Sequence, residues 1–184
     1  MSEVAERYAT IANGFTRRVG GVPKERWASP SPCSEWAARD VMAHVVNTHY
    51  RVLATLDGAE APVVEADDDA ASRWPDVRDA ILDALNDEAR ASQVVSGIFS
   101  DQPFSSLVGR LLCSDTLIHT WDLARATGQD DRLDPIAAAR ALEFLTTIDE
   151  AIRRPGGFGA KIEPAPGADE QTKLLNFAGR AVDD

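Results

Sequence analysis

Cysteine is scarce in this sequence of 184 residues, which contains only Cys33 and Cys113. Two cysteines so far apart exclude both a disulfide framework and a zinc site built from several cysteines. Long apolar runs are also absent, because no stretch reaches the roughly 18–20 residues that a transmembrane helix needs. The first residues are charged and amphipathic, without the basic start and apolar middle of a signal peptide. We therefore expect a cytoplasmic protein that does not associate with a membrane.

Positive charge is in deficit, since the formal net charge is −11. Such a protein is repelled by the phosphates of nucleic acids and by anionic lipid surfaces, so we expect neither as a partner. Hydrophobic residues make up 44% of the chain, which is enough to bury a core. Ala, Leu and Glu are plentiful and β-branched runs are short, which favours helix. The length favours one domain over residues 1–184.

Apolar residues recur at helical spacing in several segments that carry recognisable start and stop signals. In the first half, these signals predict a helix ended by residues 20–23, a helix over 35–57 with Ser34 as its N-cap and Gly58 after its end, and a helix with Pro75 in its first turn. In the second half, they predict a helix over residues 106–127 ended by Gly128, a helix from Asp134-Pro135 to residues 155–157, and a short helix ending at Gly179.

These helices, with short to moderate connections, predict an all-α protein, an antiparallel four-helix bundle with an extra short C-terminal helix. The first three helices, with the fourth or the fifth, are expected to form its core. No series of strands is expected. The acidic run of residues 67–69 is interpreted as an exposed charge run, because no glycine turn or terminal glutamate completes a calcium-binding loop.

The fourth predicted helix has polar residues where an apolar seam is expected. Steps of four and three residues place six positions on one face, namely Val108, Leu112, Asp115, His119, Asp122 and Ala126. Burying the three polar side chains without partners would cost several kcal/mol. They therefore need partners, from another helix or from a bound ion.

Asp115 and His119 lie one helical turn apart, so a carboxylate and an imidazole project together and can hold the same divalent ion. His44, among apolar residues of the second predicted helix, is the better candidate for a third ligand. His49 is rotated by roughly 140° from His44, and we expect it to face outward or line a rim. The alternative is that these residues have a purely structural role. An Asp and a His at this spacing are common by chance, and a buried histidine is often hydrogen-bonded to a carboxylate without any metal.

Three further residues are candidates for roles around such an ion. Asp40 precedes His44 by one turn and Asp122 follows His119 by three residues, so each is placed to accept the second N–H of an imidazole ligand. A second interpretation of Asp122 is a surface ion pair with Arg125. Arg51 is a candidate to bind a substrate carboxylate, with a solvated surface arginine as the ordinary alternative.

The two cysteines and two of the tryptophans have simpler interpretations. Cys33 precedes a predicted helix, where a thiolate can be favoured, but packing is the preferred interpretation. Cys113 is interpreted as a small buried apolar residue. Trp36 and Trp121 are expected to anchor the core, and either can instead wall a pocket beside the ion.

Three segments, PSPCSEWAARDVMAHVV, DTLIHTWDLARATG and LLNFAGR, resemble the DinB-like superfamily. They are most similar to the actinobacterial branch related to the N-terminal domain of mycothiol-dependent maleylpyruvate isomerase. This resemblance implies a four-helix bundle that binds a divalent metal through a His and a later Glu-x-x-x-His. His44 matches the first position and His119 the last, and Asp115 takes the place of the glutamate.

The resemblance also implies a function. It predicts a metal site, with zinc favoured over nickel or another divalent ion, and a transferase or isomerase that uses mycothiol on a small electrophile. The partners would then be a small-molecule thiol and an electrophilic substrate, and the protein a monomer or a homodimer. The alternatives are a non-catalytic bundle that binds a metal or a small molecule, and a metal-dependent hydrolase.

Overall fold

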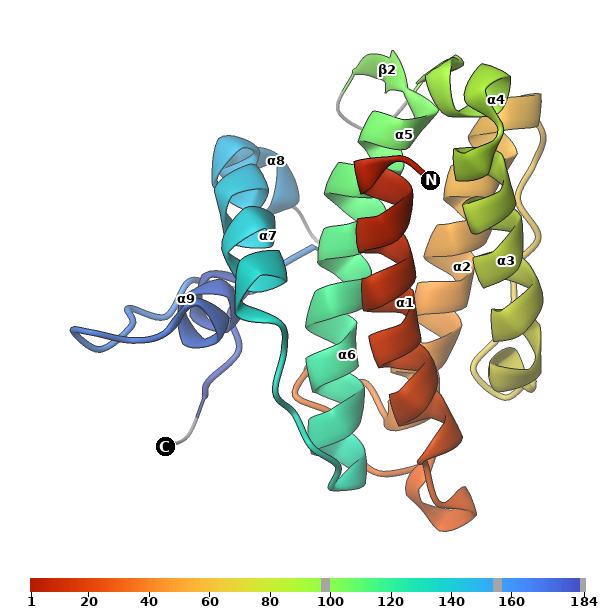
Figure 1. Ribbon diagram of the computed structural model, residues 1–184. Coiled ribbons are helices and arrows are strands. Elements are labelled where there is room, and N and C mark those ends of the chain that lie inside the picture. Colours follow the sequence, from red (N-terminus) through yellow and green to blue (C-terminus); the bar gives the residue numbers. More distant parts are fainter. Residues whose placement is uncertain (97–99, 154–156, 183–184) are drawn as a thin grey trace.

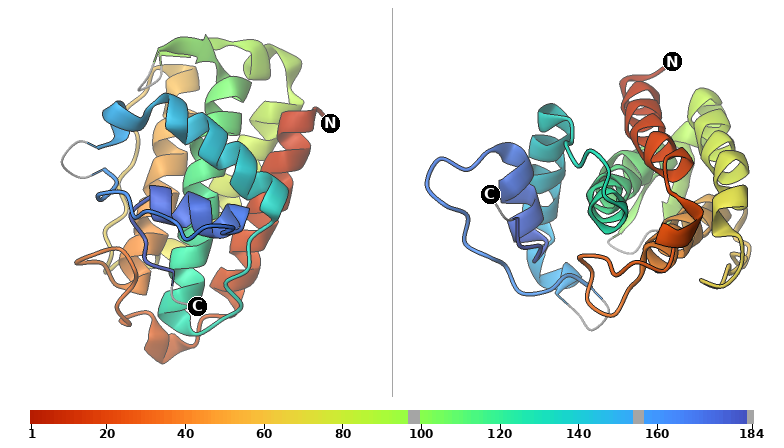
Figure 2. Two further views of the ribbon diagram at one scale, coloured as in Figure 1. Left: turned by 90° about the vertical axis from the view of Figure 1, so that its left-hand side faces the viewer. Right: turned by 90° about the horizontal axis from the view of Figure 1, so that it is seen from below.

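Four long helices pack side by side in the computed structural model, which describes residues 1–96, 100–153 and 157–182 (Figure 1). They are α1 (Glu3–Gly20), α2 (Ala38–Asp57), α3 (Ala70–Asn86) and α6 (Cys113–Thr127). Helices α1 and α2 each contact both α3 and α6, so the four form a closed ring, as the end-on view of Figure 2 shows. The all-α bundle predicted from the sequence is confirmed.

The directions of the four helices do not simply alternate. Helices α1 and α6 run one way and α2 and α3 run the other way, so the pairs α1–α6 and α2–α3 are parallel (Figure 1). The connection over residues 58–69 runs from the end of α2 back along the length of the bundle to the start of α3. Twelve extended residues span about 40 Å, which exceeds the length of about 30 Å for the 20 residues of α2. The predicted bundle therefore contains one long crossover.

Short elements join and flank these helices. Before α6 lie η1 (Lys24–Arg26), α4 (Glu88–Ser92), the antiparallel strands β1 (Val94–Ser96) and β2 (Asp101–Pro103), α5 (Phe104–Leu107) and η2 (Val108–Leu112), a π-helical turn that leads into α6. After it lie α7 (Pro135–Thr147), α8 (Asp149–Ile152) and α9 (Glu170–Phe177). Helix α7 contacts α6 and α9 outside the ring (Figure 2). None of the described helices is long and apolar enough to span a membrane.

Local signals located several helix ends correctly. Gly58 and Gly128 follow α2 and α6 in the left-handed conformation, with φ angles of 61° and 74°. Asp134 Oδ1 accepts a hydrogen bond of 2.8 Å from the backbone N–H of Ala137 at the start of α7. The prediction that this helix continues to residues 155–157 was wrong, because α7 ends at Thr147 and the separate helix α8 follows. Of that predicted end, residues 155 and 156 lie outside the described part of the chain.

Two predicted helix starts were wrong. Helix α2 begins at Ala38 rather than Glu35, because Glu35 has a φ of 68° and the carboxylate of Asp40 caps the backbone N–H of Ala37. Helix α3 begins at Ala70, where Asp69 accepts a hydrogen bond from Ser72 N–H. Pro75 therefore lies inside α3 and not in its first turn.

His49 is fully buried, which contradicts the expected outward orientation. Its Nδ1 donates a hydrogen bond of 2.7 Å to Val45 O, and its ring lies 4.9 Å from the ring of Trp74 and 5.9 Å from that of Tyr8. The prediction failed because α2 packs against α3 as well as α6. A rotation by about 140° from His44 therefore leads to a second inward face rather than to solvent.

Burial of His49 makes the stability of the bundle depend on pH. Burial lowers the pKa of His49 from 6.5 to about 4. The unfolded chain therefore binds a proton that the folded chain does not, and stability falls as the pH falls from 6.5 towards 4, by up to about 3 kcal/mol. We expect urea unfolding of metal-free protein to show this loss. In His49→Phe the loss should be smaller, and an equal loss in both proteins would contradict the assignment.

Candidate metal centre

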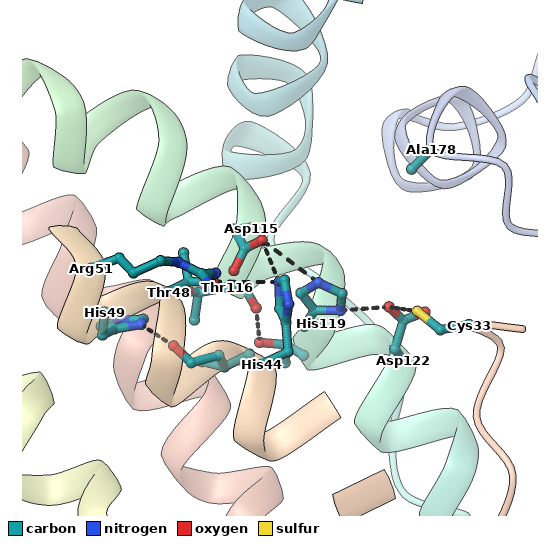
Figure 3. A network of polar contacts seen from close by, with 12 residues as sticks. Cys33, His44, Thr48, His49, Arg51, Asp115, Thr116, His119, Asp122 and Ala178 are labelled. Carbon is teal, nitrogen blue, oxygen red and sulfur yellow. Dashed lines mark hydrogen bonds and ion pairs between the residues drawn. The ribbon is translucent and has the colours of Figure 1, made fainter. Parts of the chain in front are cut away.

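Three potential metal ligands meet where α2 faces α6. His44 Nε2 lies 3.1 Å from Asp115 Oδ1, and His119 Nε2 lies 3.6 Å from the same oxygen. One ligand atom from each of the three side chains lies within 4.8 Å of the other two. Figure 3 shows both imidazoles directed at the carboxylate. The fold thus brings His44 together with two residues about 70 positions later in the chain.

The electrostatics of this cluster favour a cation. Burial alone would raise the pKa of Asp115, but the neighbouring His44 and His119 outweigh it, and the pKa is well below its ordinary value. Asp115 is thus a carboxylate whose Oδ2 is buried and has no hydrogen-bond partner. A buried oxygen without a partner is costly, and a metal ion would satisfy it.

The donor set fits a divalent transition metal. Two imidazoles and one carboxylate are ligands of zinc and of several related ions. The short side chain of Asp115 lies close to both imidazoles, so the three donor groups face one another. The side chain of His44 is 28% exposed and that of His119 only 5% exposed, so the cluster opens to solvent on the side of His44.

A buried carboxylate orients His119 through the ring nitrogen that faces away from Asp115. Asp122 is fully buried, and its Oδ2 accepts a hydrogen bond of 2.8 Å from His119 Nδ1. This bond directs His119 Nε2 towards Asp115, as expected for a supported metal ligand. The alternative pairing of Asp122 with Arg125 is not found among the described residues, in which Asp122 contacts His119 and Arg180 and Arg125 contacts Asp131 at 3.3 Å.

Arg180, which sequence analysis missed, holds Asp122 in turn. Its Nε lies 3.2 Å from Asp122 Oδ1 and its Nη2 lies 2.9 Å from Oδ2, a two-point contact of a buried guanidinium. Burial alone would raise the pKa of Asp122, but His119 and Arg180 outweigh it and lower the pKa to about 2. Gly179 precedes this arginine with a φ of 80°, and a Cβ there would lie 2.9 Å from Ala160 O. In the sequence, the glycine of LLNFAGR indicates a turn of the chain directly before Arg180.

Cys33 belongs to this polar network rather than to the apolar core. Its Sγ lies 3.2 Å from Asp122 Oδ2 and 2.9 Å from Arg180 Nη2. Cys33, His119 and Asp122 are also close enough together to hold a metal ion. Arg180 already supplies the positive charge at this place, however, and burial together with Asp122 raises the pKa of Cys33 to about 12. In the metal-free protein Cys33 is therefore a thiol that takes part in the hydrogen-bond network of Asp122 and Arg180.

The same pKa predicts that Cys33 reacts slowly with electrophiles, because the thiolate is the reactive form. We expect iodoacetamide to modify it at pH 7.5 at least about tenfold more slowly than in the protein unfolded by urea. Peptide mass spectrometry over time measures the rate at each cysteine. Equal rates in folded and unfolded protein would show that Cys33 is not held as a thiol.

The remaining predicted residues lie at different distances from the cluster. Asp40 caps Ala37 with a hydrogen bond of 2.7 Å, and no hydrogen bond or ion pair joins it to His44 among the described residues. Arg51 Nη2 donates to Thr48 Oγ1 at 2.8 Å, and that oxygen lies 3.5 Å from His44 Nε2 (Figure 3). Arg51 therefore reaches the cluster through Thr48.

The two tryptophans have different surroundings. The ring of Trp36 lies 4.9 Å from that of His44 and 5.9 Å from that of His119, so Trp36 forms a wall beside the cluster. Trp121 is buried in the core with 1% of its surface exposed. Of the two interpretations left open by the sequence, the pocket wall applies to Trp36 and the core anchor to Trp121.

Comparisons with known proteins identify the family of the chain. Residues 8–124 match the family model of the mycothiol maleylpyruvate isomerase N-terminal domain, and this range contains His44, Asp115 and His119. Two proteins of Mycobacterium tuberculosis named as uncharacterized, one from strain CDC 1551 / Oshkosh and one from strain H37Rv, are each 30% identical over 181 residues. That alignment covers 92% of this chain and 93% of each relative. No solved structure matches. The chain belongs to the mycothiol maleylpyruvate isomerase N-terminal domain family.

Proposed function

We propose that this protein binds a divalent metal ion, most simply zinc, through His44, Asp115 and His119. We further propose that it uses the site to activate the thiol of mycothiol for a transfer or isomerisation on a small electrophile. The observation that carries the proposal is the carboxylate of Asp115, whose Oδ1 faces two imidazoles and whose buried Oδ2 has no hydrogen-bond partner. Membership of a family named for a mycothiol-dependent isomerase supports the choice of thiol.

The bound ion would supply a positive charge that lowers the pKa of a neighbouring thiol. The residues of the chain perform the other tasks. Asp122 accepts the Nδ1 proton of His119 and so leaves the Nε2 lone pair directed at the cluster. Arg180 keeps Asp122 ionised and in place, and Trp36 shields one side of the imidazoles from water.

Substrates would approach on the exposed side of His44, where Arg51 is placed to bind an anionic group. We expect Arg51→Gln to raise the KM for an electrophile with a carboxylate by about 10-fold, with little change in kcat, because hydrogen bonds to charged groups contribute about 1.5–3 kcal/mol. Steady-state kinetics measure the effect. Arg39→Gln, in which an arginine of α2 that pairs with Asp67 is replaced, is the matched control. An equal rise in KM for an uncharged electrophile would contradict the role.

Incubation of metal-loaded protein with mycothiol tests the function directly, with maleylpyruvate and simple alkylating agents as electrophiles. We expect conjugation or isomerisation that depends on the thiol and exceeds the rate of a His44→Ala control. Metal binding without such turnover would contradict the proposed enzymatic activity and would indicate a non-catalytic binding protein. Turnover of an ester without any thiol would instead indicate a hydrolase.

A further inference from the structure

A second site is indicated by a cavity of about 590 Å³ between α1, η2, the start of α6 and α7. Three arginines from three of these elements, Arg7, Arg110 and Arg140, line it together with a single carboxylate, that of Glu143. In a protein with a net charge of −11, this is a local excess of positive charge. Such an excess attracts anions to the cavity.

The cavity lies on the opposite side of α6 from the metal cluster. Cys113 and Ser114 line the cavity, whereas Asp115 and His119 face α2. At 100° per residue, the two pairs point roughly 170° apart around the helix axis. The cavity is therefore separate from the proposed metal centre and adjoins α7, which packs outside the four-helix ring (Figure 1).

Arg7 is positioned in the wall of the cavity without a counter-ion. Its Nη2 donates a hydrogen bond of 3.2 Å to Gly109 O, while its Nε is buried and has no partner. The ion pairs between described residues include none of Arg7. A Cβ at position 109 would lie only 2.6 Å from Arg7 Nη2, so the glycine makes room for this guanidinium. A glycine is unfavourable inside a helix, and here its benefit is the close approach of Arg7.

Gln102 supplies an independent sign of a missing ligand. It extends from β2 into the wall of the same cavity, is 8% exposed, and has a buried Oε1 with no hydrogen-bond partner. Buried acceptors in folded proteins nearly always receive a hydrogen bond. A ligand with a donor group would complete this contact.

We propose that the cavity binds a small organic anion. Its carboxylate or phosphate group would lie near Arg7 and Arg110, and a hydroxyl or amide group would donate to Gln102 Oε1. Arginine matches the geometry of both anionic groups, and the volume lies within the range of small-molecule sites. Arg140 is paired with Glu3 at 2.9 Å, so the excess of positive charge in the cavity rests mainly on Arg7 and Arg110. The π-helical turn η2, which carries Gly109 and Arg110, is a feature frequent at functional sites.

Binding of two hydroxylated anions tests the proposal and distinguishes the two anionic groups. Glycerol 3-phosphate represents phosphates, malate represents carboxylates, and glycerol is the neutral control. We expect at least one anion to raise the Tm of the full chain in a saturable manner and to bind in calorimetry, while glycerol does neither. Weaker binding in concentrated sodium chloride is also expected. If both anions behave like glycerol, the proposal is wrong.

Variants locate the binding. Arg110 is exposed and forms no ion pair among the described residues, so Arg110→Gln should fold normally and bind the anion at least tenfold more weakly. Gly109→Ala retains every charge but displaces Arg7, and it should also weaken binding. Arg132→Gln, a change at an exposed arginine that does not line the cavity, should bind like the wild type. Unchanged affinity in Arg110→Gln would overturn the proposal. His119→Ala should retain anion binding, because the imidazole that it removes lies on the other face of α6.

Discussion

Replacing Asp122 with alanine is expected to lower the free energy of unfolding by about 3–5 kcal/mol. Asp122 is fully buried, and Arg180, only 7% exposed, depends on it for its counter-charge. The variant would leave a guanidinium buried without its carboxylate, and His119 would lose the acceptor of its Nδ1 proton. Urea unfolding of metal-free protein measures the loss.

Asp130→Ala provides the matched control, because Asp130 also pairs with arginines but is more than half exposed. We expect this surface change to cost no more than about 0.5 kcal/mol. Equal stability of the two variants would mean that the network of Asp122 and Arg180 does not stabilise the fold. A double change of Asp122 and Arg180 to apolar residues should recover part of the loss, since no unpaired charge then remains.

Replacing His119 with alanine is expected to weaken metal binding by at least about 100-fold, because losing even an outer partner of a ligating histidine typically costs 10–100-fold. His119 is the ligand that links the cluster to Asp122, so its loss removes a donor and the support behind it. Competition with a chromogenic chelator measures the affinity of each variant for zinc.

The chain offers a close control for this change. It contains three histidines, and His49 is the one whose ring lies among Tyr8 and Trp74 rather than beside Asp115. His49→Phe should therefore bind the metal like the wild type. Weak binding in His49→Phe together with normal binding in His119→Ala would place the ion elsewhere.

Features set by nearby residues were predictable from the sequence. The spacing of Asp115, His119 and Asp122 places them on one helical face whatever the rest of the fold, and the structure retains this face because the π-helical turn η2 ends before Asp115. Gly128 and Asp134 likewise mark helix ends through interactions within a few residues.

Features that depend on the neighbours of a helix were not predictable in this way. The orientation of His49 depends on α3 packing against α2, which no local pattern of α2 reveals. Arg180 contacts Asp122 across 58 positions of sequence, and only the folded tail brings them together. Cys33 was interpreted as a packing residue because the two charged groups beside it come from α6 and from that tail.

The central claim is that His44, Asp115 and His119 form one divalent metal site. The most direct test is the metal content of the protein purified without a histidine tag and dialysed against a zinc-containing buffer, measured by inductively coupled plasma mass spectrometry. The structure predicts one equivalent of divalent metal per chain in the wild type and in His49→Phe, and almost none in His119→Ala. Wild-type protein that retains no metal after exposure to zinc, nickel and other divalent ions would contradict the claim.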